Sequence, residues 1–571
     1  MTIEEIKETP VWQLYEKGRN YHRLTGIYTD TDKNYRFYNG NQWEGAKLGD
    51  VEPVQKNFIK SIVKYKLSVI HSNLYAIHYS PQNFANKEFA QVSDKYCQML
   101  NRYAHRVWEE EKMDFKGRRV TKDAAINDEG IIYVDFDVDR MKPVNEIIKK
   151  NDIYFGNENS DDIQSQPYIL IRKRIPVIAA IDFVTACGVS EEEAKLIKGD
   201  NDTFEQSGEA AKIELDNMTT IIYKFYKENG SVHFSVASRY LDIIENADMG
   251  IKLYPIAHMI WEEKEGSARG EGEVRQLIPN QIEVNKTEMR RVLTGKNQAF
   301  PHKVVDVSKV SNPNTLDKIG GIIKTTGMPV DDVRKIVGTI PPAQMSSDVK
   351  QLQEDLITMT RELAGAGETA TGQVNPESAS GKAILAVQQA SQAPMTEQRE
   401  SYKNFIEDIA RIWLEYLIVH SKNGIDLEKE VVDAQGNEYI EMVNVPQSVL
   451  IELQASVKID ITPKSPYDRF AQERTMENLF QQGLLSVQRL SELKIYAKIL
   501  DDDSVAPKQK IFEAIKYMED EQRKIAVIQQ KAQIMQQRAK QFLMGDEDQQ
   551  ASQLADAMAQ AEMQNAAMQP M

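Results

Sequence analysis

The most suggestive tetrapeptide in this chain is Ser380-Gly381-Lys382-Ala383, which resembles the end of a phosphate-binding loop. Such a loop, G-x-x-x-x-G-K-[ST], holds phosphates with backbone amides and the lysine, while its final hydroxyl holds Mg²⁺. Here Gly372 has the wrong spacing and alanine replaces the hydroxyl. Gly270-Glu271-Gly272 begins a dinucleotide pattern, but Arg275 stands where the third glycine belongs. Neither segment predicts a nucleotide site.

Other residues that catalyse reactions or bind metals also lack a useful arrangement. The eight histidines are scattered, and His71 and His78 fit ordinary packing better than a metal site. Asp501-Asp502-Asp503 precedes a predicted helix, where negative charge complements the helix dipole. Cys97 and Cys187 occur in unrelated contexts, and no G-x-S-x-G motif is present. We therefore expect no enzyme activity, no catalytic residue, no metal site and no cofactor.

The loop of residues 365–379 is the strongest candidate for function. From Gly365 to Gly381, Val374 is the only large apolar side chain. Loops longer than about 12–15 residues are usually either functional or disordered. The position between two strongly predicted helices favours a functional loop, and a disordered linker is the alternative. The polar residues that could contact a ligand are Glu368, Thr369, Gln373, Asn375 and Lys382.

Three predicted helices position this loop. One spans residues 272–295 and the next spans 346–364, with Ser346 or Ser347 as its N-cap. Apolar residues recur at heptad spacing along the second helix: Val349, Leu352, Leu356, Met359 and Leu363. The third helix runs from about 380 to 422 and contains Pro394. We expect a kink there, because an interior proline costs about 3 kcal/mol and bends a helix.

The insert of residues 296–345, between the first two helices, is broken by many prolines and glycines. It contains four acidic residues and seven basic ones, namely Lys296, Lys303, Lys309, Lys318, Lys324, Arg334 and Lys335. This local excess opposes the chain's net charge of −16 and suggests a docking or DNA-entry surface. A solvated charged surface is the alternative interpretation.

The rest of the chain alternates helical and strand-rich regions. The first 130 residues are predicted to be mainly helical, and one helix is expected over 54–78. An aromatic turn at Tyr35–Trp43 interrupts this helical region. Its aromatic residues fit local core packing better than a subunit interface. Strand patterns follow, with Asn229-Gly230 as a hairpin turn and a short helical insert at 178–200. Strands return at 425–463, helix dominates 467–545, and 546–571 is an Ala/Gln/Met-rich flexible tail. The predicted fold class is α+β, mainly helical.

Composition limits the classes of protein that remain. Over 571 residues the chain is 41% hydrophobic and 27% charged, as expected for a folded protein. The net charge of −16 argues against a nucleic-acid binder that reads sequence through a basic face. The acidic N-terminus lacks a signal peptide, and no apolar run approaches the ~18 residues of a membrane span. We expect a soluble protein made in a reducing cytoplasm.

Several segments, in this order, resemble tailed-phage portal proteins. FYNGNQW (37–43) and the stretch from LNRYAHRVWEEE to YVDFD (100–137) are similar to the opening wing of that family. LYPIAHMIWEEKEGSARGEGEVRQL (253–277) and the helix after it resemble the junction of wing and first stem helix. ETATGQVNPESASGKAILAVQQAS (368–391) resembles the tunnel loop and the following kinked helix.

The resemblance implies a domain organisation. Residues 1–271 and 380–466 would form the wing, 272–295 and 346–364 the two stem helices, and 296–345 the clip. Residues 365–379 would be the tunnel loop, 467–545 a helical crown, and 546–571 the tail. Within this scheme Glu368, Thr369, Gln373, Asn375 and Lys382 would face DNA, although Lys382 could equally pair with a carboxylate of a neighbouring subunit. The docking residues of the clip would be Lys303, Lys309, Lys318, Lys324, Arg334 and Lys335.

The resemblance also implies a function and partners. Portal subunits form a dodecameric ring at one capsid vertex in the virion, through which double-stranded DNA is packaged and ejected without sequence readout. The implied partners are the terminase large subunit, a head–tail adaptor, and the capsid and scaffold proteins, with assembly in the host cytoplasm and no membrane. An acidic chain suits such a channel, because neutralising many phosphates would bind DNA tightly. An internal scaffold or head-completion protein is the alternative.

Overall fold

The computed structural model describes most of the chain up to Pro463 and short helical pieces beyond it. The described residues are 8–47, 52–80, 87–200, 217–299, 303–315, 322, 324–326, 337–341, 344–367, 393–432, 438–452, 456–463, 518, 524–525, 527–537 and 556–560. The chain divides into two units, Met1–Pro463 and Lys464–Met571. Helices and antiparallel sheets both contribute to the first unit, so the predicted α+β class is confirmed.

A three-stranded antiparallel sheet lies at the centre of the first unit, in the order β3-β2-β9. Its strands are β2 (Glu129–Asp137), β3 (Lys142–Ile148) and β9 (Ile256–Ile260). Helix α12 (Thr396–His420) packs against this sheet with a nearly continuous buried face. Its Trp413 indole N–H donates to Asn145 Oδ1 at 3.0 Å, and the Tyr416 hydroxyl donates to the Val134 carbonyl at 3.1 Å. These bonds fix how α12 crosses the sheet.

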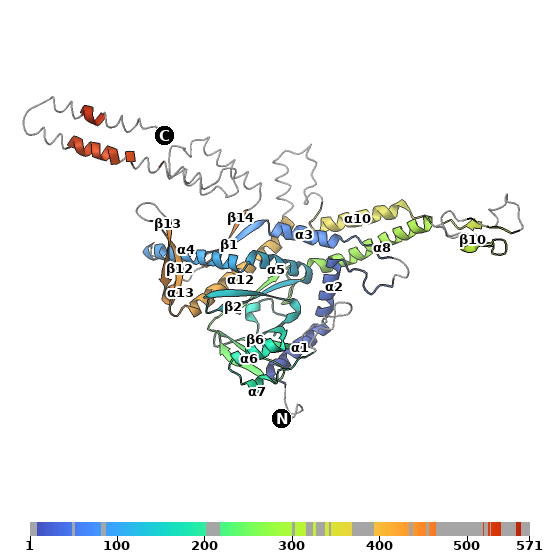
Figure 1. Cartoon of the computed structure of the whole chain (residues 1–571), viewed down its shortest axis with the longest axis horizontal. Coiled ribbons are helices and arrows are strands. Elements are labelled where there is room, and N and C mark those ends of the chain that lie inside the picture. The colour runs from blue at the N-terminus through green and yellow to red at the C-terminus, as the bar shows by residue number, and fades with distance from the viewer. Residues whose placement is uncertain are drawn as a thin grey trace, which may run out of the picture. The chain divides into compact units, whose positions relative to one another are not determined.

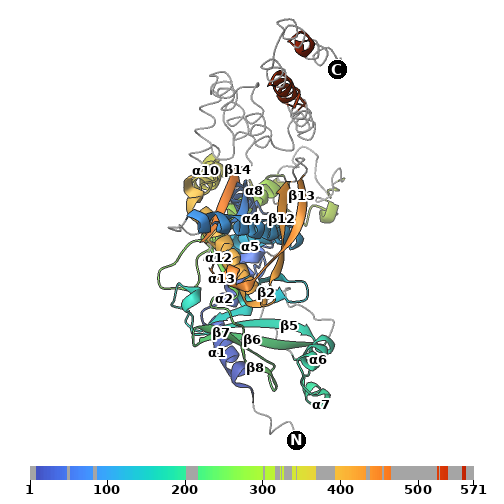
Figure 2. The ribbon, with the colours of Figure 1, turned by 90° about the vertical axis from the view of Figure 1, so that its left-hand side faces the viewer.

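A five-stranded antiparallel sheet, β4-β5-β6-β7-β8, forms a second layer (Figure 2). Its strands are β4 (Ile153–Phe155), β5 (Ile169–Pro176), β6 (Met218–Glu228), β7 (Ser231–Ala237) and β8 (Asp242–Asp248). Side chains alternate between the faces of a strand. Ile222 therefore packs with α1 (Pro10–Leu24), while Ile221 packs with α6 (Val177–Ala186) and α7 (Glu191–Ala194). The sheet is thus covered on both faces.

Two local sequence predictions in this region are confirmed. The β6–β7 hairpin turns at Asn229 and Gly230, which have φ values of 52° and 84°. Positive φ at both central residues is what the favoured two-residue hairpin turn requires. The short helical insert expected at 178–200 corresponds to α6 and α7.

The predicted helix over residues 54–78 is wrong in its last part. Helix α3 (Phe58–Ile70) ends there, and β1 (Asn73–Ser80) pairs in antiparallel register with β14 (Ser456–Pro463). Tyr75, Ile77 and Tyr79 are buried at a spacing of two, which is the strand period. The helical pattern of α3 concealed this short alternation, and the partner strand comes from the far end of the unit.

The N-terminal helices surround this core. They are α2 (Ile27–Asn39), α4 (Lys87–Glu110) and α5 (Met113–Asn127), which follow α1 in Figure 1. Phe37 and Tyr38 are buried, Tyr35 donates to Asp123 Oδ1 at 2.7 Å, and the Trp43 indole donates to the Val54 carbonyl at 3.1 Å. The aromatic turn is therefore part of the local core.

Pro394 does not lie inside an α-helix. It lies in a 3₁₀ turn, Ala393–Met395, directly before the first residue of α12. Proline is tolerated at a helix start, where its missing N–H leaves no intrahelical bond unmade. The kink predicted at Pro394 stays a prediction, because residues 380–392, on its N-terminal side, lie outside the described part of the chain.

The remaining elements complete the two units. A two-stranded antiparallel sheet is formed by β12 (Ile425–Val432) and β13 (Glu438–Val445), and α13 (Gln447–Glu452) follows it. In the second unit, residues 527–537 are helical within the predicted crown. Residues 556–560 are also helical, which differs from the flexible tail expected there.

Candidate functional site: the helix pair and its base

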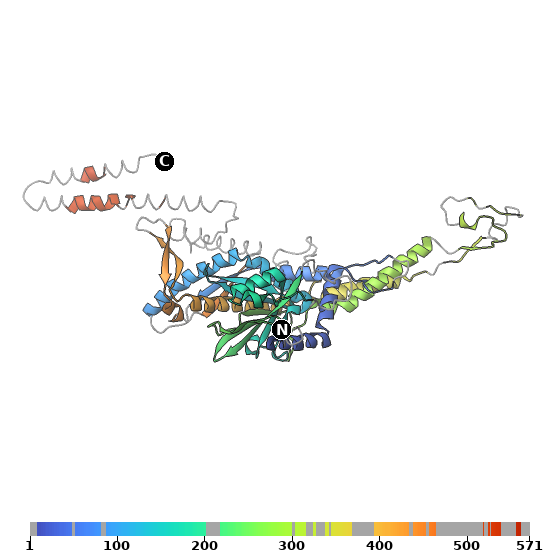
Figure 3. The same cartoon turned by 60° about the horizontal axis from the view of Figure 1, so that its bottom comes forward.

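Two antiparallel helices, α8 (Glu273–Ala299) and α10 (Ser347–Leu363), form the central element of the candidate site. Figures 1 and 3 show them side by side, leading from the sheets toward β10. The two predicted helices are confirmed, and Ser346 is the N-cap of α10, with its hydroxyl accepting from the Asp348 N–H. The prediction of a helix pair carrying an insert therefore matches the elements observed.

Polar side chains hold α8 and α10 in register. Asn280 Nδ2 donates to Thr360 Oγ1 at 3.0 Å, and Arg291 donates to Gln353 Oε1 at 3.0 Å. Gln353 Nε2 also donates to Glu288 Oε2 at 2.9 Å. Because Gln353 and Thr360 are both nearly buried, these directional bonds define a single alignment of the two helices.

Most of the apolar heptad of α10 faces outward. Leu352, Met359 and Leu363 are 65%, 62% and 88% exposed, while Leu356 is partly buried against the core. The heptad spacing identified the apolar stripe but did not show which side of the helix is buried. Within one subunit, Gln353 and Thr360 occupy the buried side instead.

The base of α8 is fixed to α3 and to the N-terminal region by hydrogen bonds. Gln281 Oε1 accepts from the Phe58 N–H at 3.1 Å, and Gln281 Nε2 donates to the Lys56 carbonyl at 2.7 Å. Asn285 Nδ2 donates to Gln42 Oε1 at 2.6 Å. Gln281 thereby satisfies one of the unpaired N–H groups at the start of α3. Sequence reasoning missed these polar residues, because amides within a helix pattern resemble surface positions.

A buried salt bridge marks the first turn of α8. Lys66 Nζ donates to Glu273 Oε2 at 2.5 Å, and both side chains are less than a tenth exposed. The Trp261 indole donates to the same oxygen at 3.3 Å. A carboxylate in this position also complements the positive end of the helix dipole.

The turn before α8 is fixed by buried Arg269. Its guanidinium pairs with Glu129 and with Glu158 (Nε–Oε2 2.8 Å), and donates to the Ile153 carbonyl at 3.1 Å and to His22 Nε2 at 3.0 Å. His258 lies 2.7 Å from the other oxygen of Glu129. Three segments that are far apart in sequence, around His22, Glu129 and residues 153–158, meet at this one side chain.

The charges in this cluster shift the pKa values of their neighbours. Burial tends to raise the pKa of Glu129, but Arg269 and His258 outweigh it and hold the pKa at about 2. Burial lowers the pKa of His22 to about 4, despite the nearby Glu158 carboxylate. His22 is therefore neutral near pH 7, and its Nε2 accepts a hydrogen bond from Arg269. His22 Nε2 and Glu158 Oε1, which are 3.7 Å apart, therefore do not form an ion pair at that pH.

Gly270 and Gly272 serve this packing. A Cβ on Gly270 would lie 2.2 Å from Ile260 Cγ2 and 2.4 Å from the Glu262 carbonyl oxygen. The Gly272 N–H donates to Asp128 Oδ1 at 2.7 Å, and Asp128 pairs with buried Lys150. The G-x-G segment therefore allows close approach of the backbone, and its amide is already bonded within the protein.

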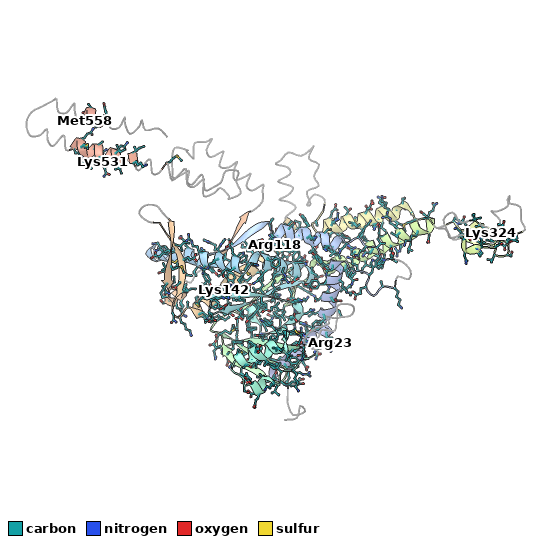
Figure 4. The ribbon with its side chains drawn as sticks, viewed as in Figure 1. Arg23, Arg118, Lys142, Lys324, Lys531 and Met558 are labelled. Atoms are coloured by element: carbon teal, nitrogen blue, oxygen red, sulfur yellow. The ribbon has the colours of Figure 1, made fainter. Side chains whose placement is uncertain are left out.

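The predicted docking residues of the insert are only partly described. Lys303 lies in β10 (Lys303–Val305), which pairs with β11 (Val337–Thr339). Lys309 is 3.5 Å from Asp306, and Lys324 is exposed, as Figure 4 shows at the far end of α8. Lys318, Arg334 and Lys335 lie outside the described residues. The three described lysines thus come from one small antiparallel segment.

The predicted DNA-facing residues of the loop, Glu368, Thr369, Gln373, Asn375 and Lys382, all lie outside the described residues. The two ends of the segment 368–392 are described, however, and they lie together. Gly365 has a φ of 69°, and a Cβ on it would lie 3.1 Å from Pro394 Cβ. The segment therefore leaves and re-enters the fold at nearly the same point.

Comparison with known families identifies the chain. Residues 189–571, more than half of the sequence, match the family model described as "Phage P22-like portal protein". The chain belongs to this portal protein family. The resemblance inferred from the sequence is thereby confirmed, and the match includes the whole α8–α10 pair and the C-terminal tail. A comparison with curated proteins found no match.

The described part of this portal protein contains neither a membrane-spanning helix nor a cluster of metal-binding side chains. Its helices are too short or too polar to span a bilayer. No group of three or more His, Cys, Asp or Glu side chains in the same residues could hold a metal ion. The histidines singled out from the sequence have other roles: His71 lies 3.1 Å from Thr121 Oγ1, and His78 lies 3.1 Å from Asn101 Nδ2.

The burial of His22 predicts a pH dependence of stability. The unfolded chain takes up this proton near pH 6.5, and the folded protein does so only near pH 4. The free energy of unfolding should therefore be undiminished above pH 6.5 and fall by up to about 3 kcal/mol as the pH drops to 4. His22→Gln should remove this part of the decrease in melting temperature between pH 7 and pH 4.5. Exposed His105→Gln is the control, and identical pH profiles for the two variants would contradict the prediction.

Proposed function

We propose that this chain is the subunit of a dodecameric ring at one capsid vertex, whose central channel carries double-stranded DNA during packaging and ejection. Membership of the portal family supports this function. The observation that carries it is the outward face of α10, where Leu352, Met359 and Leu363 are exposed in a single subunit. Burying such a stripe against a neighbouring copy stabilises an assembly by about 25 cal/mol per Å² of apolar surface.

The proposed parts of the subunit follow the observed elements. Helices α8 and α10 are the stem, the insert of residues 296–345 is the clip, and residues 365–379 are the tunnel loop. The two stretches 1–271 and 380–466 are the wing, and 467–545 is the crown, followed by the tail. The hydrogen bonds between α8 and α10 support a stem that moves as one body, because sliding the helices would break several of them at once.

In this proposal the tunnel loop forms the constriction of the channel. The longer segment that contains this loop begins and ends at neighbouring points, Gly365 and Pro394, so the segment can project from the ring. Small and polar residues allow copies of the loop to shift past one another without a fixed packed state. The contacts with DNA would be made by Glu368, Thr369, Gln373, Asn375 and Lys382, without reading sequence.

The proposed partners bind to different parts of the subunit. The clip, through Lys303, Lys309, Lys318, Lys324, Arg334 and Lys335, docks the terminase large subunit, which supplies ATP-driven motion, and later the head–tail adaptor. The wing and crown meet the capsid and scaffold proteins. The chain itself is non-enzymatic, and it resides at the portal vertex of the virion.

Electron microscopy of the purified protein tests ring formation. We expect closed rings of about twelve subunits. Replacing Leu352 and Leu363 by Asp should give folded monomers, because the new charges cannot be buried between subunits. Leu24→Asp, on an equally exposed residue of α1, is the control and should leave rings intact. Particles without rings would contradict the proposal and favour an internal scaffold or head-completion protein.

Deleting Gly367–Asn375 tests the loop. Rings should still assemble, because the proposed contact between subunits is made by the exposed stripe of α10 at Leu352, Met359 and Leu363. DNA packaging or retention should be lost or strongly reduced, as measured by the amount of protected DNA per particle. Deletion of residues 201–209, a stretch of equal length, provides the control. Loss of rings on deletion of the loop would make it structural.

Reversing charges in the clip tests the docking surface. Lys303→Glu, Lys309→Glu and Lys318→Glu together should weaken binding of the motor or adaptor by at least about tenfold, because like charges then face each other. Binding is measured by surface plasmon resonance on assembled rings. Lys195→Glu with Lys198→Glu, on the exposed α7 region, is the control. Unchanged binding would support the solvated-surface interpretation.

A further inference from the structure

A concentrated basic surface lies on α3 and α5, in a chain whose net charge is −16. It consists of Lys60, Lys64, Arg118, Arg119 and Lys122, and we call it the α3–α5 basic surface. Lys64, Arg118 and Arg119 are exposed, and the other two are partly exposed. The loop of residues 365–379 and the clip do not contribute to it, so its role is separate from those already proposed.

Helical spacing places these cations in two stripes. Lys60 and Lys64 are four residues apart on α3, as are Arg118 and Lys122 on α5, and such pairs are about 6 Å apart along a helix. Arg119 precedes Lys122 by three residues. Each stripe therefore presents its charges on one side of its helix.

The two stripes meet over one aromatic ring. Lys60 Nζ and Lys122 Nζ lie 5.9 Å and 5.2 Å from the centroid of the buried Tyr38 ring. His71 Nε2, at the C-cap of α3, also lies 3.1 Å from Thr121 Oγ1 of α5. The helices are thus direct neighbours, and Figure 4 shows Arg118 where α3 and α5 lie together.

The cations of this surface form no ion pair in the described part of the chain. None of the five residues lies within 4.0 Å of a carboxylate there, although nearby Lys116 pairs with Glu111 at 2.7 Å. Two acidic side chains of α5 form hydrogen bonds elsewhere: Asp123 accepts from the Tyr35 hydroxyl at 2.7 Å, and Asp114 accepts from the Trp108 indole at 3.1 Å. Asp123 also interacts electrostatically with Lys122 and Arg119. Because the five cations outnumber these two carboxylates, the surface keeps an excess of positive charge.

Packing around the surface orders it in advance. The Arg119 guanidinium carbon lies 5.8 Å from the Phe115 ring centroid, and Phe115 is itself 61% exposed. The ammonium groups of Lys60 and Lys122 both lie over the Tyr38 ring. Side chains that are already held by aromatic rings lose less conformational freedom when they bind an anion.

We propose that the α3–α5 basic surface binds the phosphate backbone of double-stranded DNA, without sequence readout. The choice of DNA rests on the proposed channel function; the presence of a polyanion site rests on the surface itself. Helix α3 packs against the 3₁₀ turn at Ala393–Met395 and bonds to α8 through Gln281. The surface is therefore attached to the base of the proposed stem and to the 3₁₀ turn that follows the segment 368–392. DNA passing the proposed constriction would come close to this surface.

Binding of a fluorescent duplex of about 30 base pairs to assembled rings tests this proposal, at salt concentrations from about 50 to 200 mM. Lys64→Ala, Arg118→Ala and Arg119→Ala together should weaken binding about tenfold or more. The slope of log affinity against log salt should become shallower by about 2–3, since each phosphate contact contributes about 0.9. Lys64→Arg with Arg118→Lys and Arg119→Lys keeps the charge and should retain most of the affinity.

The matched control is Arg140→Ala with Lys195→Ala and Lys198→Ala, which removes the same charge from other exposed sites and should change affinity less than about twofold. Equal affinity and slope for the triple alanine variant and the wild type would overturn the proposal. The proposal would also be overturned if the triple alanine substitution lowered the affinity for polyglutamate but not the affinity for DNA. The surface would then be a site for an acidic polypeptide. If the alanine variant does not assemble, Lys64→Gln provides the measurement, with an expected slope change of about one.

Ring formation, imaged in the same samples, separates this proposal from the proposed function. Rings whose DNA affinity is unaffected by the substitutions contradict only the α3–α5 basic surface. Absence of rings in the wild type contradicts the channel function. In that case the polyanion site is tested by the affinity of the unassembled protein for the duplex. Equal affinities of the wild type and the triple alanine variant would contradict it.

Discussion

The position of the stem depends on the buried guanidinium of Arg269. It joins Glu129 at the start of β2, Glu158 after β4 and His22 of α1 to the turn that begins α8. Removing one partner of a buried ion cluster typically costs 3–5 kcal/mol, because the remaining charge stays buried without compensation. Gly270 and Gly272 allow the surrounding backbone to close on this cluster. The direction in which α8 leaves the body is therefore set by electrostatics as much as by apolar packing.

The same principle continues along the helix pair. Lys66–Glu273, then Gln281 with Asn285, then Gln353 with Arg291 form successive polar contacts from the base of α8 outward. Apolar contacts tolerate small slides of one helix along another, whereas directional bonds do not. The proposed ring would benefit from helices with one alignment, because it would have to transmit force. In that proposal the outward apolar stripe of α10 is available to a neighbouring copy.

Local features could be predicted from the sequence because their physical causes are local. The N-cap at Ser346 and the Asn229-Gly230 turn each depend on residues within a few positions. Strand β1 could not be predicted in the same way, because its partner is β14 and Asn73 pairs with Pro463. The roles of the loop residues and of the basic residues in 296–345 stay predictions; all of the loop residues and half of the docking residues lie outside the described part of the chain.

The sequence by itself determined that no phosphate loop is complete, that two helices flank a basic insert, and that a polar loop follows them. It also contained the motifs that resemble portal proteins. Only the tertiary structure decided which side of α10 is buried, that Arg269 joins three distant segments, and that the cations of α3 and α5 share one surface. The reason is physical: periodicity reports that a helix has an apolar side, but burial and charge pairing depend on what lies opposite.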